Sequence, residues 1–149
     1  MRSLWIDADA CPVMIRDILF RAADRAALRL TLVANSPITT PGSKHIRAVQ
    51  VAKGFDAADH YIAERVQPGD LVVTQDIPLA AEVVAKGAIG LNPRGELYTA
   101  ENVASRLTMR DIADELRGMG EIRGGPSAYG TKEKHAFARQ LDRWIAAGR

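Results

Sequence analysis

The sequence predicts an α/β fold, with a doubly wound, mostly parallel five-stranded sheet and helices on both faces. Two observations support this prediction. Short apolar runs alternate along the chain with longer stretches whose apolar residues recur at helical spacing. Parallel strands need crossover connections, and the intervening helices supply them. With 149 residues, of which 47% are hydrophobic, the chain fits one domain, 1–149, with a core of its own.

The composition argues against several classes of protein. Lys and Arg number 20 against 18 acids, so the net charge of +2 gives no overall basic footprint. The single cysteine, Cys11, excludes an internal disulfide and a cysteine-based zinc site. No apolar run reaches the roughly 18 residues of a membrane span, and acids interrupt the apolar start of the chain. We therefore expect a cytoplasmic protein that does not bind membranes.

The first third of the chain predicts three strands and one helix. From Pro12, which suits a first helical turn, apolar residues recur at helical spacing to about residue 26. A loop rich in Pro, Ser and Thr separates the second and third strands at 35–45. The three strands are expected at 3–6, 28–34 and 46–51.

The rest of the chain continues the alternation. One helix is expected at 57–67, with Asp56 as its N-cap. Another is expected from Pro78 onward. Strands are expected at 71–74 and 88–91, and a turn at 92–96. Two further helices are expected at about 100–117 and 131–147, with a mobile glycine-rich segment at 118–130 between them.

Acidic residues follow two of the expected strands. Asp7 and Asp9 come after the first strand, and Asp76 comes after the fourth. In open parallel sheets, ligands bind beyond the carboxyl ends of the strands, where the winding direction switches. If the strand order is 3-2-1-4-5, the first and fourth strands are neighbours at that point. We therefore expect Asp7 and Asp76 to face each other.

Asp59 is a third contributor to this edge. It shares a helical face with Ile62, Ala63 and Val66, and this is the inward face. A carboxylate on an inward face is costly unless a cation, a basic side chain or backbone donors compensate it.

Each acid also has a structural interpretation. Asp7 or Asp9 could cap the helix that begins near Pro12, Asp76 could cap the helix at Pro78, and Asp59 could complement a helix dipole. Clustered carboxylates, however, repel one another unless a cation neutralises them. Mg²⁺ or Mn²⁺ prefers such oxygen ligands and can activate water for phosphate chemistry. We therefore predict that Asp7, Asp59 and Asp76 are catalytic metal ligands, with Asp9 as an accessory ligand.

Candidate phosphate contacts lie in loops at the same edge. Backbone amides and polar or basic side chains there could hold phosphates. Aromatic residues make up only 5% of the chain, so stacking platforms for bases are scarce. A nucleic acid substrate would therefore be recognised through its phosphate backbone. The candidate substrate-binding residues are Asn35, Ser36, Thr74, Gln75, Asn92, Arg94 and Arg123.

The motifs "DADACPV", "VANS", "GDLVVTQDIPLA", "LNPRGELYT" and "RGGP" resemble the uncharacterised bacterial YaiI/YqxD family over nearly the whole chain. That family is grouped by fold with PIN-like domains, many of which are metal-dependent ribonucleases. The resemblance implies RNA rather than DNA as substrate, and Asp7, Asp59 and Asp76 match the positions of the PIN-like acids. A fourth acid that many PIN-like domains carry after the next strand is replaced here by Asn92.

Three other interpretations remain open. "LWIDAD" also fits the start of a haloacid-dehalogenase-like phosphatase with Asp7 as nucleophile and Asp9 as general acid, but Asp70 precedes its strand and cannot complete the acid pair. Cys11 could be a nucleophile, although Arg16 falls one position short of the phosphatase spacing. The missing fourth acid also allows a non-catalytic module that binds metal or nucleic acid.

Overall fold

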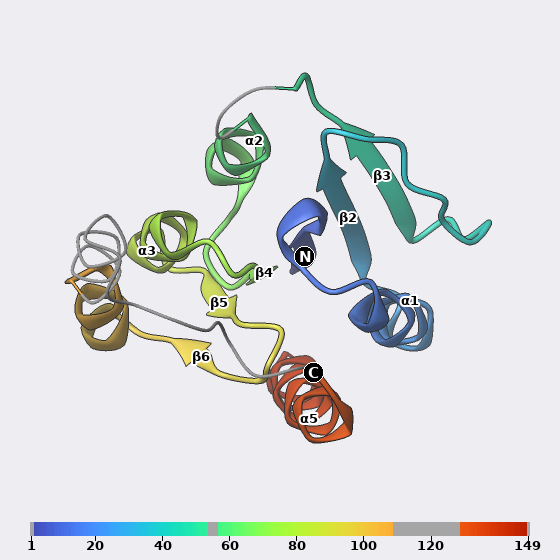
Figure 1. The fold of residues 1–149 in the computed structure, drawn as a ribbon. Helices are drawn as coiled ribbons and strands as arrows, with labels where there is room; N and C mark the ends of the chain where they lie inside the picture. The colour runs from blue at the N-terminus through green and yellow to red at the C-terminus, as the bar shows by residue number, and fades with distance from the viewer. Residues whose placement is uncertain (1, 54–56, 109–128, 149) are drawn as a thin grey trace.

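The described residues of the computed structural model form a six-stranded sheet in the order β3-β2-β1-β4-β5-β6 (Figure 1). The structure describes residues 2–53, 57–108 and 129–148. The first five strands are parallel and follow the predicted order, and β6 adds an antiparallel strand next to β5. The strands are β1 (Ser3–Asp7), β2 (Arg29–Ala34), β3 (Ile46–Gln50), β4 (Leu71–Val73), β5 (Ile89–Leu91) and β6 (Leu97–Tyr98).

The helices connect the strands as the alternation predicts. They are η1 (Ala8–Ala10), α1 (Met14–Ala26), α2 (Ala57–Arg65), α3 (Ile77–Ala85) and α5 (Thr131–Ala147), and residues 100–108 are also helical. The rest of the helix expected at 100–117, the expected mobile segment up to residue 128 and the Asp56 cap lie outside the described residues. No helix in the described ranges is both long and apolar enough to cross a membrane.

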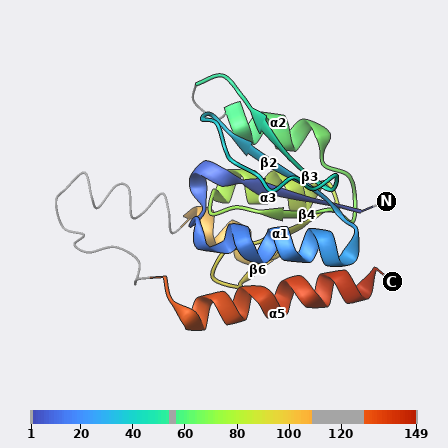
Figure 2. The same cartoon turned by 90° about the vertical axis from the view of Figure 1, so that its right-hand side faces the viewer.

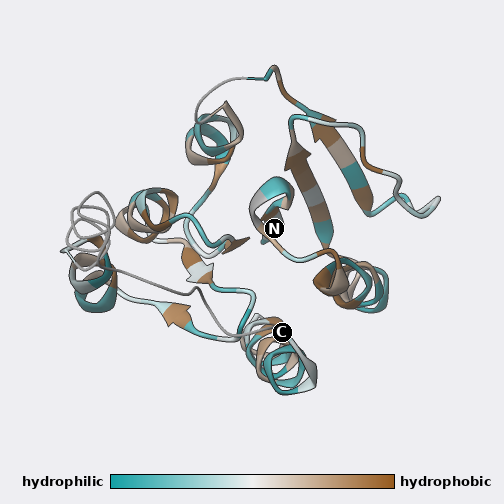
Figure 3. Cartoon of the chain, viewed as in Figure 1, coloured by the Kyte–Doolittle hydropathy of each residue, from teal (hydrophilic) through white to brown (hydrophobic). Residues whose placement is uncertain are grey.

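Two helical layers enclose the sheet. Helices α1 and α5 lie on one face, and α2 lies on the other (Figure 2). Leu4 and Ile6 of β1 pack in the cluster with α1 and α5, whereas Trp5 packs with α2 and α3. Hydrophobic residues recur along the strands, and each helix carries both hydrophobic and hydrophilic residues (Figure 3). The sheet is therefore doubly wound, as predicted.

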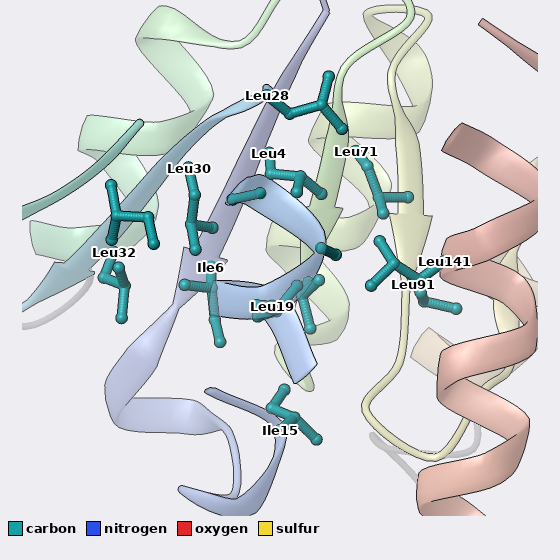
Figure 4. Packing of buried hydrophobic residues seen from close by; sticks show 14 of the residues in the cluster. Leu4, Ile6, Ile15, Leu19, Leu28, Leu30, Leu32, Leu71, Leu91 and Leu141 are labelled. Carbon is teal, nitrogen blue, oxygen red and sulfur yellow. The ribbon is translucent and has the colours of Figure 1, made fainter. Parts of the chain in front are cut away.

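The larger core lies between the sheet and the α1/α5 layer. Leu4, Leu30, Leu71 and Leu91 come from four adjacent strands and share one cluster with Leu141 of α5, which lies beside Leu91 (Figure 4). Central strands of a parallel sheet are covered on both faces, so they read as continuous apolar runs rather than as alternating patterns. The run "SLWI" is therefore buried throughout, and it carries Asp7 to the carboxyl edge.

The stripe predicted on the last helix docks as expected. Phe137, Leu141, Trp144 and Ile145 of α5 are all buried. The indole N–H of Trp144 donates to the carbonyl of Gly69 at 3.0 Å. The guanidinium of Arg2 lies over the Trp144 ring and donates to the Trp144 carbonyl at 2.7 Å. These contacts join α5 to the turn before β4 and to the residue that precedes β1.

The predicted start of the first helix is wrong by two residues. Pro12 precedes α1, which begins at Met14, and the Pro12 carbonyl accepts from the Ile15 N–H at 3.3 Å. The short helix η1 intervenes between β1 and α1. A single turn of three residues is too short to show a hydrophobic period, so the sequence pattern could not reveal it.

Strand β6 was not predicted. The expected turn at 92–96 is present, with the Asn92 N–H donating to the Glu96 carbonyl at 2.8 Å and Gly95 at φ +92°. The chain then returns along β5 with Tyr98 opposite Gly90. Asn followed by Pro and then Gly three positions later is a turn signature, and it could have indicated this hairpin.

Candidate functional site

A pocket of about 170 Å³ lies at the carboxyl edge of the sheet, where the winding direction switches. All four acids that the sequence singled out line it, although they come from three separate segments of the chain. The described residues that line the pocket include no Lys or Arg. They are Asp7, Asp9, Asn35, Ala57, Ala58, Asp59 and Asp76. The structure therefore brings these four carboxylates together without a basic side chain among the described lining residues.

Asp7 is the buried member of the group. It ends β1 and is only 4% exposed. Its pKa is raised from 3.8 to about 6, mainly by burial and in smaller part by the negative charges of Asp76 and Asp9. Hydrogen bonds with the side chains of Thr74 and Asp59 act in the opposite direction. Asp7 therefore titrates near neutral pH because it is desolvated beside other acids.

Thr74 links Asp7 to Asp76. It follows β4 and is completely buried. Its hydroxyl donates to Asp7 Oδ2 at 3.2 Å and accepts from the Asp76 N–H at 2.9 Å. Thr74 was predicted to contact phosphate, but in this structure its hydroxyl is inaccessible and is shared between two acids.

Asp76 is both a pocket residue and a helix cap. Its Oδ1 accepts from the Leu79 N–H at 3.0 Å, and a proline follows at the start of α3. The capping interpretation of Asp76 is therefore confirmed. It does not compete with the site, because the same carboxylate also lines the pocket.

Asp9 ties η1 to the loop after β2. Its Oδ2 accepts from the Asn35 N–H at 2.7 Å, and its side chain is exposed. Neither Asp7 nor Asp9 caps α1, because the N-cap of that helix is Val13 and no side chain caps it. That alternative interpretation of the two acids is therefore wrong.

Asp59 stands in the first turn of α2 and hydrogen bonds with Asp7. The face predicted to point inward is buried at Ile62, Ala63 and Val66. His60 lies on the exposed face, as the helical spacing indicates. Ala57 and Ala58 also line the pocket, and the sequence analysis did not single them out. Residues one and two positions apart on a helix do not share a face, so helical spacing gave no signal for these two alanines.

The predicted substrate-binding residues are divided between two places. Asn35 lines the pocket, whereas Ser36 and Gln75 are exposed in loops beside it and are not lining residues. Asn92 and Arg94 lie in the β5–β6 turn, outside the set that lines the pocket. Arg94 pairs there with Glu133 at 3.5 Å. Arg123 lies outside the described residues.

The structure also bears on Cys11 and Asp70. The Cys11 thiol packs against the larger core and donates to the Val73 carbonyl at 3.7 Å, and burial raises its pKa. These observations favour a packing role over a nucleophilic one. Asp70 lies next to the start of β4, where it accepts from the Ser3 N–H at 2.9 Å. It therefore lies at the end of the sheet opposite Asp76, as the sequence indicates.

The donor chemistry of the pocket suits a hard divalent cation. Carboxylate oxygens are the ligands that Mg²⁺ and Mn²⁺ prefer, and a cation would offset the cost of the buried Asp7 charge. As the side chains lie, no three Asp, Glu, His or Cys residues of the described ranges surround one ion position. The fit to a metal therefore rests on the donor set and on the desolvation of Asp7.

The fold and site define a doubly wound α/β domain with a carboxylate-lined pocket at the switch point of its sheet. Residues 5–147 match the family described as "Uncharacterized BCR, YaiI/YqxD family", so the chain belongs to the YaiI/YqxD family. The UPF0178 protein of Thioalkalivibrio sulfidiphilus is 59% identical over 96% of this chain and 97% of its own. The UPF0178 protein of Legionella pneumophila strain Lens is 58% identical over 97% of both chains.

One solved structure also resembles the chain. The crystal structure of Rae1 (YacP) from Bacillus subtilis is 15% identical and covers 100% of both chains, with a TM-score of 0.40. At this TM-score, no inference about fold or function follows from the resemblance.

Proposed function

We propose that this protein is a cytoplasmic hydrolase that cleaves phosphodiester bonds in RNA at the acidic pocket, with Mg²⁺ or Mn²⁺ as cofactor. The observation that carries the proposal is the gathering of four carboxylates in one pocket with no Lys or Arg among its described lining residues. A site of this kind attracts cations and repels a bare phosphate. It can therefore accept a phosphodiester only when a divalent ion is also bound.

The carboxylates take different roles in this proposal. Asp7, Asp59 and Asp76 hold the ion, and the exposed Asp9 assists through a water molecule. The ion, when bound, polarises the phosphate and supplies a nucleophilic water near neutral pH. Thr74 orients Asp7 toward Asp76 through the two hydrogen bonds of its hydroxyl.

Substrate binding through the phosphate backbone is supported by the polar loops beside the pocket. Asn35 lines the pocket, and its side-chain amide can donate to a phosphate oxygen. Ser36 and Gln75 are exposed next to it and extend this polar surface. The preference for RNA rests on the resemblance to PIN-like ribonucleases.

A non-catalytic module that binds metal or nucleic acid is the second candidate. It is favoured by Asn92, which stands after β5 where many PIN-like domains carry a fourth acid. Its side chain donates to Tyr98 Oη at 3.1 Å and lies outside the set that lines the pocket. With fewer acidic ligands, an ion can bind while the cleavage step remains slow.

Two assays on the purified chain separate these candidates. Binding of Mn²⁺ is measured by isothermal titration calorimetry, and cleavage of labelled single-stranded RNA and DNA of one sequence is followed with and without Mn²⁺. We expect Mn²⁺-dependent cleavage that favours RNA. Asp7→Asn and Asp59→Asn should each reduce cleavage about 100-fold or more, because even residues that only support metal ligands are worth about 10- to 100-fold.

The matched control is Asp17→Asn, which removes an exposed carboxylate from the first turn of α1. It should leave binding and cleavage unchanged. Binding of Mn²⁺ without cleavage of either nucleic acid would favour the binding module. An absence of Mn²⁺ binding in the wild type would contradict the proposed function. Cleavage rates of Asp7→Asn and Asp59→Asn equal to that of Asp17→Asn would contradict it as well.

A further inference from the structure

The β5–β6 hairpin holds both peptide groups of Thr74. The Thr74 N–H donates to the Leu91 carbonyl of β5 at 3.1 Å. The Thr74 carbonyl accepts from the hydroxyl of Tyr98 on β6 at 2.9 Å. The residue that bridges Asp7 and Asp76 is thus fixed from the opposite side by a strand that does not line the pocket.

Tyr98 is itself held firmly. It is only 4% exposed, and its hydroxyl accepts from Asn92 Nδ2 at 3.1 Å. The strand beside it makes room for the ring, because a Cβ on Gly90 would lie 2.9 Å from Tyr98 Cδ2. Burial raises the pKa of Tyr98, so its hydroxyl stays protonated as a donor.

A continuous chain of hydrogen bonds therefore runs from the hairpin to the acids. It passes from the Asn92 side chain to the Tyr98 hydroxyl, then to the Thr74 peptide, and from the Thr74 hydroxyl to Asp7 and Asp76. Removing the Tyr98 hydroxyl would leave the Thr74 carbonyl without this partner. A buried carbonyl that loses its donor tends to shift or to recruit water.

We propose that Tyr98 is a positioning residue for the acidic pocket. Its hydroxyl fixes the backbone of Thr74, and the Thr74 hydroxyl in turn holds Asp7 and the Asp76 backbone at a set separation. The inference deepens the proposed function, and only its catalytic consequence rests on that function. It also assigns Asn92 to this hydrogen-bond chain rather than to direct contact with substrate.

The test compares Tyr98→Phe with Tyr129→Phe. The control is matched, because the Tyr129 hydroxyl donates to the Pro93 carbonyl of the same hairpin at 2.8 Å and has no link to Thr74. Amide exchange of Asp76 is measured by NMR in the metal-free protein. We expect Tyr98→Phe to speed this exchange about two- to tenfold, which corresponds to the loss of one hydrogen bond, and Tyr129→Phe to leave it unchanged.

A second pair of variants tests the Thr74 hydroxyl directly. Thr74→Ser keeps the hydroxyl and should retain wild-type Asp76 exchange and Mn²⁺ affinity. Thr74→Val keeps the shape and removes the hydroxyl, so we expect faster exchange and weaker Mn²⁺ binding. In RNA cleavage, Tyr98→Phe should lower kcat several-fold with little change in KM, because it alters the arrangement of the acids rather than the substrate contacts.

The failures of the two proposals can be told apart. If Asp76 exchange in Tyr98→Phe equals that in Tyr129→Phe, or if Thr74→Ser behaves like Thr74→Val, the positioning role of Tyr98 is overturned even when RNA is cleaved. If the wild type neither binds Mn²⁺ nor cleaves RNA, the proposed function fails. The exchange data would still decide whether Tyr98 positions the acids.

Discussion

At the level of single residues, Asp7 shows how burial and neighbouring charges act on one carboxyl. Its pKa of about 6 in the folded protein exceeds the ordinary value of 3.8, so between these pH values the folded state binds more protons than the unfolded state. The free energy of unfolding therefore falls as the pH rises from about 4 to about 6. The charged Asp7 destabilises the metal-free fold at neutral pH.

Asp7→Asn should remove this pH dependence. The amide keeps an oxygen that can accept from Thr74 and carries no charge. Relative to the wild type, the free energy of unfolding of the variant should rise by up to about 3 kcal/mol between pH 4 and pH 7. One unit of pKa shift corresponds to about 1.4 kcal/mol of stability. Urea unfolding of both proteins without divalent ions measures the difference. If the free energies of unfolding of the two proteins change in parallel with pH across this range, Asp7 does not have the raised pKa.

Asp70 is the buried acid that serves the fold rather than the pocket. It is 2% exposed and accepts from the Ser3 N–H, the Trp5 indole N–H and the Gln67 N–H. Asp70→Ala should lower the free energy of unfolding by about 3 kcal/mol, because buried donors lose their acceptor. Its Mn²⁺ affinity should match the wild type under conditions where it is folded. A selective loss of Mn²⁺ binding would show that the two ends of the sheet are coupled.

The positions of the acids were predictable from the sequence, but the role of Thr74 was not. The edge rule for parallel sheets needs the residue that follows each strand, which can be read from the pattern, and the strand order, which was assumed to be 3-2-1-4-5. The role of Thr74 depends on the direction of one hydroxyl and on a partner, Tyr98, in an unpredicted strand. Hydrophobic periodicity contains no information about such contacts.

At the level of elements, the β5–β6 hairpin depends on a glycine. Gly95 has φ +92°, and a Cβ there would lie 2.5 Å from the carbonyl carbon of Ala136 on α5. Gly95→Ala should lower the free energy of unfolding by about 2–4 kcal/mol, from backbone strain and from the forced separation of hairpin and helix. Gly42→Ala is the control, because a Cβ at Gly42 meets nothing within 4 Å. Equal stability of the two variants, measured by thermal unfolding, would refute this close approach.

The elements differ in how well the sequence predicts them. Strands β1, β2, β4 and β5 stand out as short, mostly apolar runs bounded by turn residues or helices. Strand β3 mixes apolar and polar residues, as suits its place at the edge of the sheet. Strand β6 has two residues, one of which, Leu97, is exposed, so it has no apolar run to detect. It forms because the Asn92–Glu96 turn brings it back along β5.

At the level of the whole molecule, α5 completes the larger core. Phe137 is fully buried and belongs to the core cluster between the sheet and the α1/α5 layer. Phe137→Ala should lower the free energy of unfolding by about 3–5 kcal/mol. This is a large part of the total free energy of unfolding of a typical domain, which is about 5–15 kcal/mol. His135→Ala, on the exposed face of the same helix, should cost less than about 0.5 kcal/mol. Urea unfolding of both variants tests whether α5 is part of the cooperative fold.

The fold tolerates few changes in the length of strand β1. Its even-numbered residues, Leu4 and Ile6, enter one core, and its odd-numbered residues, Trp5 and Asp7, face the other side and the pocket. Deleting one codon within this strand would exchange the two sets and turn the Asp7 carboxylate toward the α1/α5 core. Substitutions can therefore vary the chemistry of this strand, whereas single-codon insertions and deletions there should be eliminated from the gene.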